Sequence, residues 1–179
     1  VSTAAVGLYS NYYTVIAGVS AFISIINTAL ISSIGNLGAK KENQKQYDYF
    51  KLLIEFYHFV AAAGAIGFFL LLNNFVTIWL GNEYLFDSKI VFAIALNFYV
   101  STAVNPVWMY REANGLFERV KYLMLIMAGL NIVLSVLLGI IWGTFGILFA
   151  TVLARLLTSV WYEPRILYGN VFNEKTGAY

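Results

Sequence analysis

The sequence predicts an all-α protein, a polytopic bundle of five transmembrane helices that forms a single domain over residues 1–179. First, 60% of its residues are hydrophobic and only 11% are charged, with a mean hydropathy of +0.74. Soluble domains carry about 25% charged residues, and one of this size could not bury so much apolar surface. Second, five apolar stretches are each long enough to cross about 30 Å of hydrocarbon as a helix. Third, nearly all the charged residues gather in the connections between those stretches.

The expected spans occupy residues 6–34, 49–72, 90–110, 120–141 and 145–167. The apolar segment 73–81 is too short to cross a membrane, so we expect it to cap the second helix and lie at the interface. Lysines and arginines number four in the first connection, one in the second, three in the third, none in the fourth and two in the tail. By the positive-inside rule, this alternation places the first and third connections and the tail in the cytoplasm. We therefore expect a multi-pass protein of the plasma (inner) membrane and, because the chain starts at Val1 instead of Met, a part of a longer protein.

Four of the five expected helices carry small or polar residues at a spacing of three or four, which places them on one helical face. These residues are Ser10, Thr14, Ala17, Ala21, Ser24, Thr28 and Ser32 in the first span, Asn97, Ser101 and Asn105 in the third, Ala128, Asn131 and Ser135 in the fourth, and Thr151, Arg155, Thr158 and Tyr162 in the fifth. One interpretation is ordinary packing, since small residues and interhelical hydrogen bonds hold membrane helices together. The other is that several stripes line one wet central cavity.

Pro106 should kink the third span, because proline removes a backbone hydrogen bond from a helix. The neighbouring Asn105 could satisfy the freed carbonyls. A bent helix suits a transporter that alternates between two openings, although kinks also occur in static bundles.

Arg155 is the most informative single residue, because it lies near the middle of the fifth span. A guanidinium at that depth costs at least about 2.5–3.5 kcal/mol on insertion scales. It could face a wet cavity and bind the oxygens of a phosphate in bidentate fashion. Alternatively, it pairs with a carboxylate or with backbone carbonyls. We expect Arg155, together with Asn97, Asn105 and Asn131, to contact the substrate of a transport cavity.

Glu55 and His58 lie at positions i and i+3 of the second span, so their side chains can touch. Such a pair could relay protons and couple transport to an ion gradient. Alternatively, Glu55 lies at the interface beside Lys51 and His58 bonds a neighbour. Glu55 is the one acid that we expect within the membrane, and it lies away from the centre.

Other classes of site have no residues to support them. The chain has no cysteine and one histidine, which excludes cysteine and multi-histidine metal sites. It contains no P-loop, nucleophile elbow or glycine-rich dinucleotide turn. No dense basic stripe suggests nucleic acid. We therefore expect no catalytic activity, cofactor, metal ion or nucleic-acid partner.

Several strings occur in an order and spacing that resemble one family. They lie at 6–12, 35–37, 75–81, 97–99, 115–117, 131–135 and 161–164, and they read VGLYSNY, GNL, FVTIWLG, NFY, GLF, NIVLS and WYEP. Together they resemble the C-terminal half of the polysaccharide-export flippases of the Wzx type, in the superfamily of the multidrug and toxin extrusion antiporters. The resemblance implies a two-lobed bundle with pseudo-symmetric halves. By position, Arg155 resembles the cationic cavity residues of that family, which are thought to meet the substrate's pyrophosphate.

The resemblance implies a transporter that carries undecaprenyl-pyrophosphate-linked oligosaccharide repeat units across the membrane by alternating access, for polysaccharide biosynthesis. Its partners would be that glycan lipid, membrane lipids and the polymerase and glycosyltransferases of glycan assembly. A drug or cation antiporter is the nearest alternative, but such antiporters often use intramembrane acids. A polytopic enzyme of glycan assembly usually has a large outer loop, and the outer connections here are short. A membrane subunit that scaffolds other enzymes is the remaining alternative.

Overall fold

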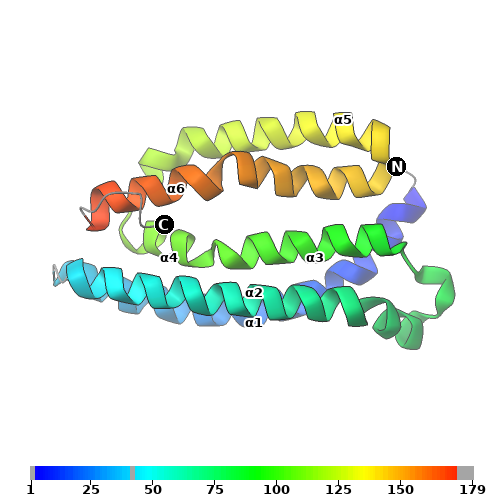
Figure 1. Ribbon diagram of the computed structural model, residues 1–179, viewed down its shortest axis with the longest axis horizontal. Helices are drawn as coiled ribbons and strands as arrows, with labels where there is room; N and C mark the ends of the chain where they lie inside the picture. The colour runs from blue at the N-terminus through cyan, green and yellow to red at the C-terminus, as the bar shows by residue number, and fades with distance from the viewer. Residues whose placement is uncertain (1–2, 41–42, 173–179) are drawn as a thin grey trace.

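The computed structural model describes residues 3–40 and 43–172, and within these residues every element is helical. The elements are α1 (Thr3–Ala39), α2 (Asn43–Leu80), the 3-10 turn η1 (Asn82–Tyr84), α3 (Ser88–Ala103), α4 (Asn105–Ala113), α5 (Phe117–Leu157), α6 (Ser159–Leu167) and the π-helical turn η2 (Tyr168–Phe172). The long helices lie side by side in one elongated bundle (Figure 1). An all-α fold is therefore confirmed for the part of the chain that the structure describes.

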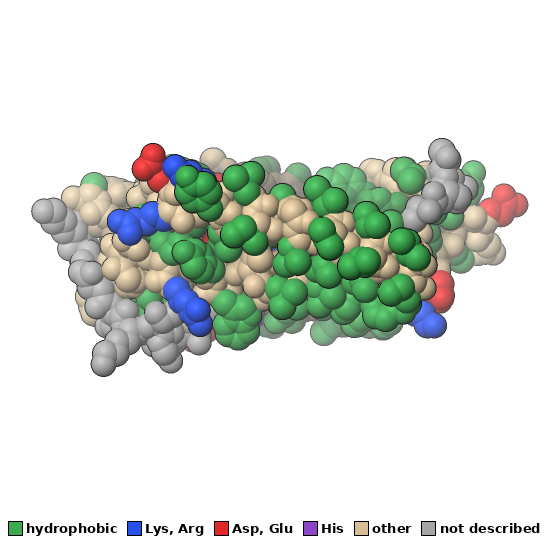
Figure 2. Space-filling model, turned by 90° about the horizontal axis from the view of Figure 1, so that it is seen from above, with side chains coloured by type: hydrophobic (Ala, Val, Ile, Leu, Met, Phe, Trp, Pro, Cys, Tyr) green, Lys and Arg blue, Asp and Glu red, His purple; other side chains and the backbone are tan. Residues whose placement is uncertain are grey.

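Four described segments are long and apolar enough to cross a membrane. They are Ala5–Ala39, Gln44–Leu80, Ser88–Ala113 and Phe117–Phe172. The number is four and not the expected five because the fourth and fifth expected spans lie in one segment of 56 residues, in which the non-helical residue Gly143 separates them. On the face seen in Figure 2, hydrophobic side chains cover the middle of the molecule and charged side chains lie toward its two ends. This distribution suits a body that is embedded in lipid at its middle.

The α5 helix reverses its direction at Gly143. This residue has φ 60° and ψ −137°. Such a conformation is essentially confined to glycine. Figure 1 shows α5 running along the bundle from its start and then turning back beside itself. A Cβ atom at Gly146 would overlap the backbone carbonyl of Leu138, so the two sides of the turn are in backbone contact. We refer to residues 117–142 as the outgoing arm of α5 and to residues 144–157 as its return arm.

The α2 helix continues to Leu80, so residues 73–80 of the expected capping segment form the last turns of this helix, and Gly81 follows them. No proline or glycine occurs between Gly67 and Gly81, and nothing in the sequence ends the helix earlier. Gly81 has a φ of 103°, and its amide N–H donates to the carbonyls of Val76 and Thr77 at 3.3 and 3.0 Å. A glycine of positive φ commonly closes a helix in this way.

The third expected span is divided at Val104 into α3 and α4, and Pro106 lies in the first turn of α4. The predicted break at Pro106 is therefore confirmed, and its cause is the missing N–H of proline. The capping role expected for Asn105 is not observed. Its side chain makes no hydrogen bond to any residue that the structure describes.

A buried tyrosine anchors the connection between α2 and α3. The Tyr12 hydroxyl donates to Asn73 Oδ1 at 2.6 Å and accepts from the backbone N–H of Phe86 at 2.9 Å. Asn73 Nδ2 donates in turn to the Phe86 carbonyl at 3.2 Å. These bonds satisfy backbone groups outside the helices, which is necessary wherever water is scarce.

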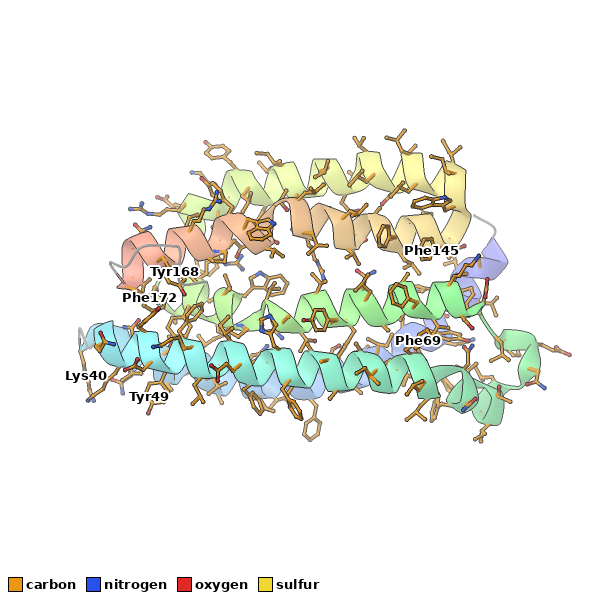
Figure 3. The ribbon with its side chains drawn as sticks, viewed as in Figure 1. Lys40, Tyr49, Phe69, Phe145, Tyr168 and Phe172 are labelled. Carbon is orange, nitrogen blue, oxygen red and sulfur yellow. The ribbon has the colours of Figure 1, made fainter. Side chains whose placement is uncertain are left out.

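An aromatic cluster closes one end of the bundle. The ring centroids of Phe50 and Tyr110 lie 5.0 Å apart, and that of Phe172 lies 5.1 Å from Phe50. Figure 3 shows Tyr168 and Phe172 at the end of the molecule that also holds Lys40. We call this the Lys40 end and the opposite one, where α5 reverses, the Gly143 end. The cluster joins α2 and α4 to η2 and holds the Lys40 end together.

Candidate functional site: a polar groove beside Arg155

A polar groove lies between α1, the α3–α4 pair and the return arm of α5. It consists of two adjoining hollows of about 360 and 260 Å³, which share Ser20, Ser101 and Thr102. The hollow nearer the Lys40 end is also lined by Asn27, Asn105 and Trp108, and the other by Asn97, Thr151 and Arg155. Hydroxyl and amide groups from three separate helical segments therefore face one continuous space.

Arg155 lies on the wall of this groove, in the return arm of α5. Its Nη1 donates a hydrogen bond to Ser101 Oγ on α3, and its guanidinium carbon lies 6.0 Å from the centroid of the Trp108 ring. A guanidinium over an indole face gains cation–π attraction. No described carboxylate lies within ion-pair distance of Arg155, so the described residues leave its charge without a counter-ion. Of the two interpretations of Arg155, these contacts favour a cation that is available to a ligand.

The three candidate asparagines lie in different places. Asn97 lines the groove, but its Nδ2 donates to the carbonyls of Ala93 at 3.1 Å and Leu148 at 2.7 Å. It thus joins α3 to the return arm of α5 and keeps its carbonyl oxygen for other partners. Asn105 lines the other hollow. Asn131 lies on the outgoing arm, lines neither hollow and accepts a hydrogen bond from Ser135 at 3.2 Å.

The stripe that α1 presents to the groove agrees in part with the expected one, because Ser24 and Thr28 line the groove. The groove is also lined by Tyr13, Ser20 and Asn27, each one residue away from a member of the predicted series. A shift of one residue rotates a helix face by about 100°. The prediction gives weight to small residues and omits the longer Asn27. Asn27 is held in place because its Oδ1 accepts a hydrogen bond from the hydroxyl of Tyr57 on α2.

The polar stripe expected in the fifth span is split between two surfaces. Thr151 and Arg155 line the polar groove, whereas Thr158 and Tyr162 line a separate groove on the side of the outgoing arm. The helix breaks at Thr158, which has φ −123° and ψ −85°, and α6 begins at the next residue. Because of this break, residues after Thr158 face a different direction from residues before it. Helical spacing in the sequence does not reveal such a break.

A buried ion pair lies beside the groove and is not among the contacts expected from the sequence. Arg111 Nη1 on α4 donates to Glu163 Oε2 on α6 at 2.9 Å, and the two residues are 7% and 3% exposed. The guanidinium carbon of Arg111 lies 6.0 Å from the Trp108 ring, as that of Arg155 does. The Trp108 ring therefore lies near both arginines: Arg111, whose charge Glu163 neutralises, and Arg155, which faces the groove. Two signals could have revealed the pair: an acid inside the fifth expected span and an arginine at the end of the third.

Glu55 and His58 do not form the expected pair. Both are exposed on α2, and no hydrogen bond or ion pair joins them. His58 Nδ1 lies 2.8 Å from the Ile54 carbonyl, and Lys51 pairs with Asp48 at 3.2 Å instead of Glu55. The acid buried among the described helices is Glu163, whereas Glu55 lies on an exposed face of α2. That face of α2 points away from the other described helices.

Within residues 3–40 and 43–172, no three histidine, aspartate or glutamate side chains gather as they would around a metal ion. The groove instead offers hydroxyls, amides, the guanidinium of Arg155, the carboxylate of Glu112, and indole and phenol rings. This set suits a polar organic ligand, and the guanidinium suits an anionic group on it. Comparison of the chain with models of known families, with curated proteins and with solved structures gives no match.

Proposed function

We propose that this chain is part of a membrane transporter that moves undecaprenyl-pyrophosphate-linked oligosaccharide units across the plasma (inner) membrane for polysaccharide biosynthesis. The observation that carries the proposal is Arg155, a cation without a described counter-ion on the wall of a polar groove. A pyrophosphate needs such a cation, since guanidinium binds phosphate oxygens strongly and in fixed geometry.

We further propose that the chain crosses the membrane five times. The last apolar segment has 56 residues. As a straight helix it would extend about 84 Å, far beyond the roughly 30 Å of hydrocarbon. The reversal at Gly143 divides this segment into the outgoing arm and the return arm with its continuation through α6 and η2 to Phe172, and each of these two parts is long enough to cross. Under the positive-inside rule the Lys40 end then lies in the cytoplasm and the Gly143 end outside.

The groove has chemistry that suits the proposed headgroup. Its hydroxyl and amide groups, among them Ser101 and Asn105, can exchange hydrogen bonds with sugars, and Arg155 can hold the pyrophosphate. Ser20, Ser24 and Thr28 of α1 are exposed at its edge. Polar side chains that face lipid are unfavourable, so a second lobe that covers this edge accords with the two-lobed architecture that we propose.

The observed charges favour an anionic substrate over the cationic drug of an antiporter. The one acid that is buried in the described residues, Glu163, is already neutralised by Arg111. A cation site would require an acid that is free to bind its ligand. Glu112, the acid that lines the polar groove, is exposed near the Lys40 end, while the free charge in the hollow with Asn97 and Thr151 is on Arg155.

We expect Arg155→Ala to lower flipping of an undecaprenyl-pyrophosphate oligosaccharide at least about tenfold, because it removes charge-assisted hydrogen bonds to the pyrophosphate. The measurement is accessibility of the labelled glycan to a membrane-impermeant reagent in proteoliposomes of the full-length protein. Arg155→Lys should retain part of the activity, since it keeps the charge and loses the bidentate geometry.

Lys89→Ala is the matched control, because it removes one cation from an exposed position outside the groove and should leave flipping unchanged. Flipping by the Arg155→Ala variant at the rate of the unmodified protein would exclude Arg155 as the pyrophosphate site. Equal losses in both variants would show a general effect of charge.

Glu55→Gln should leave flipping within about twofold of the unmodified protein. Glu55 is exposed and has no described partner. Surface substitutions of this kind change the free energy of unfolding by less than about 0.5 kcal/mol, and we expect the same here. The proteoliposome assay, run with and without a pH gradient, checks the effect on flipping. Complete loss of gradient-driven flipping would assign ion coupling to Glu55.

A further inference from the structure

A second groove lies on the opposite side of the return arm, between the outgoing arm of α5 and α6. It has a volume of about 440 Å³, and its lining includes Arg119, Tyr122, Trp161 and Arg165 but no acidic residue. We call it the Arg119–Arg165 groove. It shares no lining residue with the polar groove.

The two arginines of this groove come from antiparallel segments and lie at the same end of it. Arg119 is in the first turn of α5 and Arg165 is in the last turn of α6, both toward the Lys40 end of the bundle. Both are exposed, and no ion pair involves either of them in the part of the chain that the structure describes. The groove therefore has two positive charges that nothing described neutralises.

The lining changes from charged to apolar along the groove. Tyr122, Tyr162 and Trp161 follow the arginines, and Ile126 and Leu157 come after them toward the Gly143 end. All five of these side chains are exposed although each is large and either aromatic or aliphatic. The groove thus passes from cations to aromatic rings and then to aliphatic side chains. Membrane proteins show the same order from water through the interface into hydrocarbon.

We propose that the Arg119–Arg165 groove binds an anionic phospholipid of the cytoplasmic leaflet, with the phosphate between the two arginines and one acyl chain along Ile126 and Leu157. Charge complementarity selects this occupant, because basic recesses between helices at this level bind anionic headgroups. The aliphatic half of the groove then receives the acyl chain. The proposal rests on α5 and α6 crossing a membrane and is independent of glycan transport.

Native mass spectrometry of the detergent-solubilised protein, titrated with phosphatidylglycerol or phosphatidylcholine, tests this proposal. The unmodified protein should retain phosphatidylglycerol in preference to phosphatidylcholine. The double variant R119Q/R165Q should bind phosphatidylglycerol about 25-fold more weakly, since each cation near an anionic lipid contributes about a fivefold factor. Should the double variant not fold, R119Q and R165Q tested singly should each lower the affinity about fivefold.

The matched control K40Q/K89Q also removes two positive charges, but neither lysine lines the groove. It should lower the affinity less than about threefold, because distant exposed charges are screened. An equal loss in the control, or equal binding of the two lipids by the unmodified protein, would overturn the proposal. So would displacement of phosphatidylglycerol by millimolar inorganic phosphate, because the site would then recognise a free anion.

Discussion

Arg111→Met is expected to lower the free energy of unfolding by about 3–5 kcal/mol. The substitution leaves the Glu163 carboxylate 3% exposed and without its partner at 2.9 Å. A buried charge that loses its counter-ion keeps the whole cost of desolvation, which is why removal of one partner is so unfavourable. Thermal and denaturant unfolding in detergent, followed by circular dichroism, measure the effect.

The double variant R111M/E163L separates the pair from the packing around it. Because this variant removes both charges, we expect its free energy of unfolding to lie within about 1 kcal/mol of that of the unmodified protein. Lys51→Met is the matched control, because it breaks an ion pair with Asp48 whose side chains are about half exposed. Such exposed pairs contribute about 0–1 kcal/mol. If Arg111→Met were no more harmful than Lys51→Met, the pair between α4 and α6 would not be buried as described.

Gly146→Val is expected to prevent the return arm of α5 from packing against the outgoing arm. A Cβ at Gly146 would overlap the backbone carbonyl of Leu138, and backbone cannot rotate aside as a side chain can. Overpacking against flexible side chains lowers the free energy of unfolding by about 1–3 kcal/mol. Because the neighbour here is backbone, we expect a loss of at least about 3 kcal/mol. The same unfolding measurements apply, together with labelling of single cysteines introduced at Glu118 and Asn170.

With Gly146 unchanged, the two cysteines should react with a reagent added on the same side of the membrane. In the Gly146→Val variant they should either react from opposite sides or belong to a protein that no longer folds. Gly129→Val is the matched control, because a Cβ at Gly129 meets nothing within 4 Å. It should cost less than about 1 kcal/mol, which is the effect of a β-branched residue on helix propensity. Equal melting temperatures for the two variants would show that the arms do not approach so closely.

The long apolar helices could be predicted from the sequence because the cost of exposing backbone and charge in hydrocarbon acts locally, along each segment. The observed α1 and α2 are longer than the expected spans, because both helices continue into the polar connection between them and α2 also continues through the apolar segment 73–80. The break at Pro106 was also predictable, since proline acts on its own helix. The place of the reversal was predicted as well, because Gly143 lies in the connection 142–144 between the fourth and fifth expected spans. The backbone conformation of Gly143 and the close approach of the two arms were not.

The candidate site was predictable only in part, for a related reason. Arg155 is conspicuous in the sequence because a charge in the middle of an apolar segment needs an explanation. Whether Asn131 shares a cavity with Arg155 depends on which arm of α5 faces α1. The return arm lines the polar groove, whereas Asn131 lies on the outgoing arm and bonds Ser135. Likewise, helical spacing allowed Glu55 and His58 to touch, but His58 Nδ1 lies against the Ile54 carbonyl instead.

The sequence by itself therefore determined the all-α class, the apolar segments, the break at Pro106 and the exceptional position of Arg155. These properties depend on composition and on contacts within a few residues along one helix. Only the tertiary structure decided that Arg111 pairs with Glu163, that Ser20 and Asn27 join Arg155 in one groove, and that the backbones of the two arms of α5 meet at Gly146 and Leu138. Those features arise where segments distant in sequence approach one another, and helix rotation and side-chain packing, which periodicity cannot specify, determine which residues meet.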